Sequence, residues 1–147
     1  MWITITETHL KTRLSDPELT AFKSVALAAG QANPVSEIIA DVTNLIRGYV
    51  ANCQRNRLGS DGTIPDKLLS SALAIIVMQV MTRAAGKVID PNGVRQKASE
   101  DAIRLMEQVA GCKFAVEIPD DFSSENIQNF TPTISSRDFR FRDQDGI

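Results

Sequence analysis

The sequence predicts an all-α fold: an antiparallel bundle of about four or five helices, with a short strand and an extended C-terminal arm. Apolar residues recur at helical spacing in several stretches, and capping residues, prolines and glycines separate these stretches. The 147 residues suit one domain with a real core. We therefore expect a helical bundle domain over residues 1–112 and an extended arm over residues 113–147.

Two short helices are expected at the N-terminal end. Thr6 is a suitable cap for a helix that runs to about Leu14. Ser15 and Glu18 have the spacing of a capping box, in which each side chain bonds the other residue's backbone N–H. A second helix should therefore begin here, and Gly30 marks its end.

The clearest helical pattern begins with Asn33, a capping residue, and Pro34, which suits a first turn. Over residues 35–50, apolar side chains repeat at i, i+3, i+4 and i+7, the spacing of a helix that buries one face. After a loop at residues 56–63, a further helix opens at Ile64–Pro65 and is apolar nearly all round. Such a helix is central, either in its own core or between subunits.

The C-terminal part of the chain begins with a turn at residues 90–93 and a last helix, which Gly111 ends. Residues 114–118 alternate apolar with polar or small side chains, as in a short strand, and Pro119 stops this pattern. Residues 137–142 alternate phenylalanine with charged residues, which favours an extended segment with one buried face.

Aromatic residues are concentrated in the arm. Five of the six phenylalanines lie in residues 113–147, which also carry a net charge of −3 against +1 for residues 1–112. A disordered tail is normally poor in aromatic residues, because large apolar rings favour burial. Either the rings pack on the chain's own domain, or some of them dock on a partner.

The composition argues against several classes of protein. The net charge of −2 does not suit a strongly basic nucleic-acid binder, and no run of about 18 apolar residues predicts a membrane span. The N-terminus has no basic run followed by an apolar core, so we expect no signal peptide. Cys53 and Cys112 are too few for a disulfide scaffold, and we expect reduced, small buried side chains inside the cell.

No arrangement of catalytic residues is evident. His9 is the single histidine, so a histidine-based metal site or triad is not expected. The carboxylate pairs Glu100–Asp101 and Asp120–Asp121 are adjacent in sequence and do not face each other on a helix. There is no glycine-rich phosphate loop and no nucleophile elbow. We expect no enzyme activity, no cofactor and no metal.

Four basic residues cluster around the loop between the two long helices: Arg47, Arg55, Arg57 and Lys67. A solvated patch is the simpler interpretation, and contact with phosphate or an acidic partner is the alternative. Without interleaved aromatic residues, the pattern is a weak signal for nucleic acid.

The order of several short segments suggests a family. They are LSDPEL at residues 14–19, IRGYV at 46–50, IPDKLL at 64–69, DA at 101–102, and GCKFAV at 111–116 with Pro119. In this order they resemble the small helical head–tail connector (adaptor) proteins of tailed bacteriophages, including the Mu-like connector group. The resemblance covers about residues 1–119, and none of its segments is catalytic.

The resemblance implies a structural protein of the virion neck, assembled in the host cytoplasm. Such proteins form a ring, commonly a dodecamer, beneath the portal protein at the capsid vertex. The ring extends the DNA channel, through which DNA passes without tight binding, and offers a platform for a stopper or tail-completion protein. No membrane is involved.

Aromatic anchors usually dominate the binding energy of an interface, so the arm is the first candidate for partner contacts. The candidate interface residues are Phe130, Phe139, Arg140, Phe141 and Arg142 in the arm, with Arg55 and Arg57 in the loop. The alternative function is a small helical nucleic-acid-associated regulatory or binding module that uses the basic patch. An enzyme is a third hypothesis, and it would need residues from a partner chain.

Overall fold

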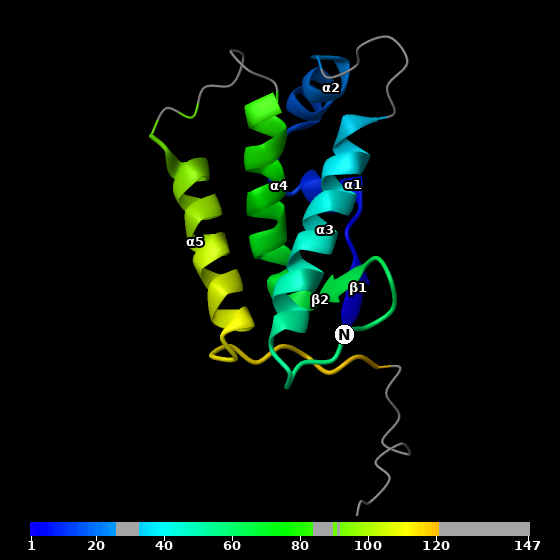
Figure 1. Cartoon of the computed structure of the whole chain (residues 1–147). Helices are drawn as coiled ribbons and strands as arrows, with labels where there is room; N and C mark the ends of the chain where they lie inside the picture. The colour runs from blue at the N-terminus through cyan, green and yellow to red at the C-terminus, as the bar shows by residue number, and fades with distance from the viewer. Residues whose placement is uncertain (26–32, 84–89, 91, 121–147) are drawn as a thin grey trace, which may run out of the picture.

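The computed structural model describes residues 1–25, 33–83, 90 and 92–120 (Figure 1). These residues are mainly helical and also form one short two-stranded sheet. In chain order the elements are β1 (Trp2–Thr4), α1 (Glu7–Leu10), α2 (Asp16–Val25), α3 (Pro34–Asn52), β2 (Thr63–Pro65), the 3-10 helix η1 (Asp66–Leu68), α4 (Leu69–Arg83) and α5 (Val94–Ala110).

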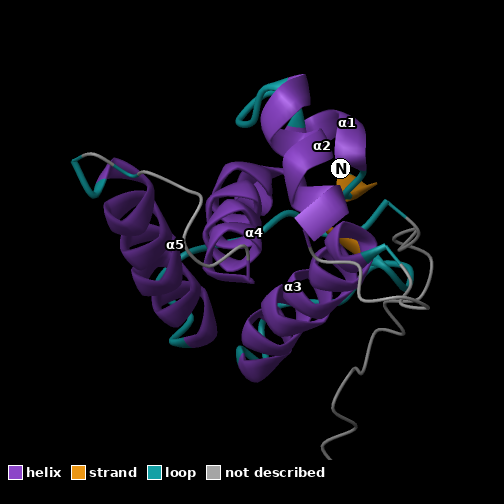
Figure 2. Cartoon of the chain, turned by 90° about the horizontal axis from the view of Figure 1, so that it is seen from above, coloured by secondary structure: helices purple, strands orange, loops and turns teal. Residues whose placement is uncertain are grey.

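Helix α4 lies at the centre of the molecule. It packs against α3 and α5, which also contact each other, while α1 and α2 cover its remaining side (Figure 2). The apolar helix of the sequence therefore lies in the core of its own chain, because its side chains are enclosed by elements from both halves. Its buried residues are Ala72, Leu73, Ile75, Ile76, Val77, Val80 and Met81.

The predicted helix starts at Ser15 and Asn33 are confirmed. The backbone N–H of Ser15 donates to Oε2 of Glu18 at 2.9 Å, as a capping box requires. Asn33 caps α3 by accepting from the N–H of Val35 at 3.1 Å, and Pro34 follows in the first turn. Local sequence therefore sets where α2 and α3 begin.

Two carboxylates near these caps also join helices to each other. Glu7 of α1 accepts hydrogen bonds from Lys23 of α2 and from Nδ2 of Asn33, at the start of α3. Glu18 of α2 accepts from Nη2 of Arg95 in α5 at 3.1 Å. Because both carboxylates bridge separate elements, they hold α1 and α2 against the long helices.

The first helix is shorter than predicted, because it ends at Leu10 and not near Leu14. Residues 11–14 form turns, in which the hydroxyl of Thr12 donates to the carbonyl oxygen of His9 at 2.7 Å. Leu14 is still buried, since the turn brings its side chain back into the core. The apolar spacing thus predicted burial correctly and helix length incorrectly.

The strands differ from the prediction. β1 and β2 pair antiparallel, with Ile3 opposite Ile64, and neither strand was expected. The prediction that a helix opens at Ile64–Pro65 is wrong, because these residues pair in β2 and the helical turns begin with η1 at Asp66 and α4 at Leu69. The predicted strand at residues 114–118 is wrong, since those residues have no strand assignment. Phe114 and Val116 pack against the core while Ile118 is exposed. The alternation of apolar and polar residues therefore reflects partial burial of Phe114 and Val116 in an irregular segment, not a strand.

Two further predictions concern residues that the structure describes only in part or not at all. The turn at residues 90–93 is confirmed where it is described, since the N–H of Gly93 donates to the carbonyl oxygen of Asp90 at 3.2 Å. The predicted extended segment at residues 137–142 lies outside the described residues. In the described part of the chain, no helix combines the length and the apolar character needed to cross a bilayer.

We expect the stability of the fold to fall in acid through Glu7 and Glu18. The hydrogen bond from Lys23 holds the pKa of Glu7 below its ordinary value of 4.5, and the backbone N–H of Ser15 does the same for the pKa of Glu18. A lowered folded-state pKa stabilises the fold above the ordinary value, and this contribution is lost as pH falls through the lowered pKa.

Chemical denaturation between pH 6 and pH 3 measures the effect. The double variant Glu7→Gln and Glu18→Gln should be less stable than wild type at pH 6, and its stability should depend less on pH below 4.5. Glu107→Gln, at an exposed position of α5, is the control for loss of a carboxylate. An unchanged acid dependence in the double variant would contradict the prediction.

Candidate partner interface

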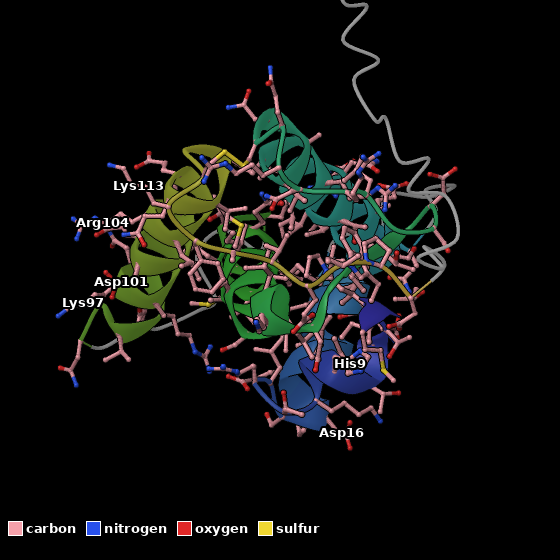
Figure 3. The ribbon with its side chains drawn as sticks, turned by 90° about the horizontal axis from the view of Figure 1, so that it is seen from below. His9, Asp16, Lys97, Asp101, Arg104 and Lys113 are labelled. Atoms are coloured by element: carbon pink, nitrogen blue, oxygen red, sulfur yellow. A yellow bond between two sulfur atoms is a disulfide. The ribbon has the colours of Figure 1, made fainter. Side chains whose placement is uncertain are left out.

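Three segments meet where α3 and α5 end, at the lower end of the molecule in Figure 1. They are residues 1–4, the loop and strand at residues 53–65, and the segment at residues 111–120 that follows α5. Figure 3 shows this end directly, with the last segment crossing from α5 toward β1. We call these three segments together the junction.

Trp2 connects all three parts of the junction. Its ring lies against Gly59, where an added Cβ would come within 2.7 Å of the ring atom Cδ2. Its Nε1 donates to the carbonyl oxygen of Glu117 at 2.9 Å, and the carboxylate of Glu117 accepts from the backbone N–H of Asp66 at 3.1 Å. The chain therefore leaves the described body, after Asp120, from a fixed position.

Arg47 of α3 organises the loop of the junction. Its Nη1 donates to the carbonyl oxygens of Ser60 at 2.8 Å and Thr63 at 2.9 Å. Its Nη2 donates to the carbonyl oxygen of Gly59 and to Oδ1 of Asp61, both at 3.2 Å. With its side chain only 12% exposed, Arg47 is a structural residue, so the predicted basic patch loses one of its four members.

A disulfide between Cys53 and Cys112 joins the end of α3 to the end of α5. The prediction of two separate, reduced and buried cysteines is wrong: only Cys53 is buried, and Cys112 is exposed. Each cysteine follows a helix end, and the packing of α3 on α5 brings those ends together. Gly111 caps α5 as predicted, but Cys112 adopts the left-handed conformation, with φ of 56°.

The predicted interface residues divide into two groups. Arg55 and Arg57 are exposed on the loop of the junction. The junction carries both signs of charge, because Lys113, Asp61 and Asp120 are also exposed, and Asp61 pairs with Arg47. The exposed surface of the junction is therefore mixed in charge and not uniformly basic. Phe130, Phe139, Arg140, Phe141 and Arg142 lie outside the described residues.

A shallow apolar groove runs between α3 and α5, and sequence reasoning missed it. Its lining residues are Asn44, Leu45, Gly48, Tyr49, Asn52 and Ala110. We call it the α3–α5 groove. Leu45 is 43% exposed, and Ile103, which lies two turns before Ala110 on the same face of α5 and lines a neighbouring hollow, is 40% exposed. The described residues leave this apolar surface open to solvent.

Gly48 was the signal in the sequence that marks this groove. It lies inside the 19-residue helix α3, where glycine costs roughly 0.5–1 kcal/mol relative to alanine. A Cβ at position 48 would meet no atom within 4 Å, and its φ is not in the left-handed range. Nothing in the packing of the described residues requires glycine here.

The remaining polar residues of interest have structural roles. Nδ1 of His9 accepts from the backbone N–H of Thr6 at 3.1 Å, so the single histidine supports the start of α1. Among residues 1–25, 33–83, 90 and 92–120, no three His, Cys, Asp or Glu side chains gather into a group that could hold a metal ion.

Comparison with known proteins adds no family. A scan against protein-family models, a search of curated proteins and a search of solved structures each gave no match.

Breaking the disulfide should destabilise the fold by about 2–4 kcal/mol, because the bond closes a loop between residues 59 positions apart. Urea denaturation of the oxidised and reduced protein measures the difference. A Cys53→Ala and Cys112→Ala variant should match the reduced wild type, and reductant should not change it further. Equal stability of the oxidised and reduced wild type would contradict this prediction.

Arg47→Met should destabilise the fold by about 2–3 kcal/mol, since it removes hydrogen bonds from a charged donor and leaves loop carbonyls unpaired. Thermal denaturation measures the loss. Arg104→Met is the matched control, because its side chain is 73% exposed and its change should stay within about 0.5 kcal/mol. If Arg47→Met lost no more stability than the control, the structural role of Arg47 in the loop would be contradicted.

Proposed function

We propose that this protein is a structural head–tail connector (adaptor) of a tailed phage. In this proposal it forms a ring homo-oligomer beneath the portal protein and presents a platform to a stopper or tail-completion protein. The helices α3, α4 and α5 form its antiparallel bundle, and residues 113–147 form its docking arm. The protein acts by surface contact and has no enzyme activity.

One observation carries the proposal: the root of the arm and the loop with Arg55 and Arg57 lie at the same end of the molecule. Trp2 fastens the segment before Asp120 to that loop by its contact with Gly59 and its bond to Glu117. A partner that binds the arm would thereby meet the loop as well. Two contacts from one rigid base give a neighbour both affinity and orientation.

The charge distribution also supports a conduit for DNA. Contacts between phosphates and lysine or arginine strengthen binding and would oppose movement of DNA through a channel. The chain has a net charge of −2, and the guanidinium of Arg47 is occupied by the carbonyl groups of its own loop. Both features favour passage of DNA without tight binding.

The alternative, a nucleic-acid-associated regulatory or binding module, would use the remaining basic residues near the loop. This alternative is supported by the exposure of Arg55, Arg57 and Lys67. Two features weaken this alternative: Arg47 is bound within its own loop, and exposed carboxylates also lie on the junction. We therefore place the connector proposal first.

Co-migration with the portal protein of the same phage tests the proposal. We expect the full chain to form a ring and to bind portal, and a chain lacking residues 121–147 to keep its helical circular dichroism but lose portal binding. Arg55→Ala with Arg57→Ala should weaken binding, while Lys97→Ala, on the side of α5 away from α3, should not (Figure 3).

Two results would overturn the connector proposal. One is undiminished portal binding by the truncated chain, which would remove the arm from the interface. The other is a full chain that binds no portal but shifts duplex DNA at low salt, with the shift lost in the Arg55→Ala and Arg57→Ala variant. The second result would establish the alternative module.

A further inference from the structure

The α3–α5 groove has the features of a docking site for an apolar segment of a partner. Its walls carry exposed Leu45 and half-buried Tyr49, and Gly48 and Ala110 leave the space between them open. Gly48 is the most informative of these residues, because its missing side chain benefits no contact in the described chain. Gly48 is itself exposed, so the space beside it is open to solvent and to an occupant of the groove.

Two carboxylates lie near the groove. Glu107 precedes Ala110 by nearly one turn on α5. Asp41 precedes Leu45 by one turn on α3, where it lines a neighbouring hollow together with Arg83. In the described part of the chain, neither carboxylate has an ion-pair partner. The basic residues Lys97 and Arg104 extend from the side of α5 that faces away from α3 (Figure 3). The groove therefore suits an occupant that combines apolar rings with positive charge.

The arm contains a segment with this chemistry. Residues 137–142 read Arg-Asp-Phe-Arg-Phe-Arg, with a net charge of +2 and two phenylalanines in alternate positions. In an extended peptide, alternate side chains share one side. Both rings would thus enter the groove together. Arg140 and Arg142 would lie on the opposite side of the extended segment, where their positive charge would favour binding near the carboxylates beside the groove.

The position of the arm's root favours the groove of another copy. Residues 111–120 cross the junction away from α5 and end beyond β1 (Figure 1), so the arm leaves on the far side from the groove. From Asp120 to Phe139 the extended chain spans up to roughly 60 Å, enough to reach a neighbouring molecule.

We infer that residues 137–142 of one copy bind in the α3–α5 groove of a second copy, with Phe139 and Phe141 beside Gly48. This inference rests on the proposed function, because it supplies the contact between neighbours in the ring. The contact is heterologous, since each copy offers an arm to one neighbour and a groove to the other.

Self-association of the full-length protein, measured as mass across a concentration series, tests the inference. Gly48→Leu fills the groove, and Phe139→Ala with Phe141→Ala removes the rings, so each variant should associate at least about tenfold more weakly than wild type. Ala40→Leu is the matched control, because Ala40 is exposed on α3 but does not line the groove. It should associate like wild type.

Mixing the two defective proteins distinguishes the possible occupants. The Gly48→Leu protein keeps its arm and the double phenylalanine variant keeps its groove, so the mixture should form one-to-one pairs and nothing larger. Failure to pair, with both variants monomeric, would overturn the inference, because the intact arm of one protein and the intact groove of the other would then not bind each other. Normal assembly of both variants would also overturn it.

Gly48→Ala provides a second, independent measurement. Because alanine favours helix and its Cβ meets nothing in the single chain, this variant should melt about 2–4 °C higher than wild type and yet associate more weakly. A higher melting temperature with unchanged association would overturn the inference.

Failure of the inference and failure of the connector proposal give different results. A wild-type ring that binds portal, together with Gly48→Leu rings that do the same, would reject only the groove as the site of contact. A wild-type chain that neither self-associates nor binds portal would reject both.

Discussion

The covalent bond between Cys53 and Cys112 is the constraint on which the candidate interface depends. It fixes the ends of α3 and α5, with Cα atoms 5.3 Å apart, on one side of the central helix α4. These two helices contact each other and both pack on α4, and the α3–α5 groove lies between them near the tied ends. The same bond sets the direction in which the chain leaves α5, because Cys112 holds the left-handed turn that sends residues 113–120 across the junction.

Local signals in the sequence predicted the helices well. The capping residues at Ser15 and Asn33 act within a few positions, and the apolar character of α4 requires burial wherever the helix packs. The errors concern contacts between distant residues. The pairing of Ile3 with Ile64 and the bond between Cys53 and Cys112 depend on how the helices pack, and no spacing rule in one sequence reports that.

The candidate site was predictable only in part, for the same reason. The sequence placed Arg55 and Arg57 on an exposed loop, but it could not tell that Arg47 turns inward to four groups of that loop. The guanidinium of Arg47 has the same charge whether it faces solvent or binds carbonyl oxygens, so its position in the sequence does not reveal which of the two occurs. Gly48 was a visible signal in the sequence, because glycine is unusual inside a strong helix, but only the structure shows that it lines an open groove.

A closed ring would require contacts from both the arm and the junction. A contact between an arm and a neighbour's groove joins two copies, but a linkage through a long segment does not fix the angle between them, so it allows open chains as well as rings. The angle has to come from surfaces that are rigid relative to the groove. The junction meets this requirement, because Trp2 and the disulfide attach it to the ends of α3 and α5. Affinity from the arm and orientation from the junction would therefore be separate properties, carried by residues that lie far apart in the sequence.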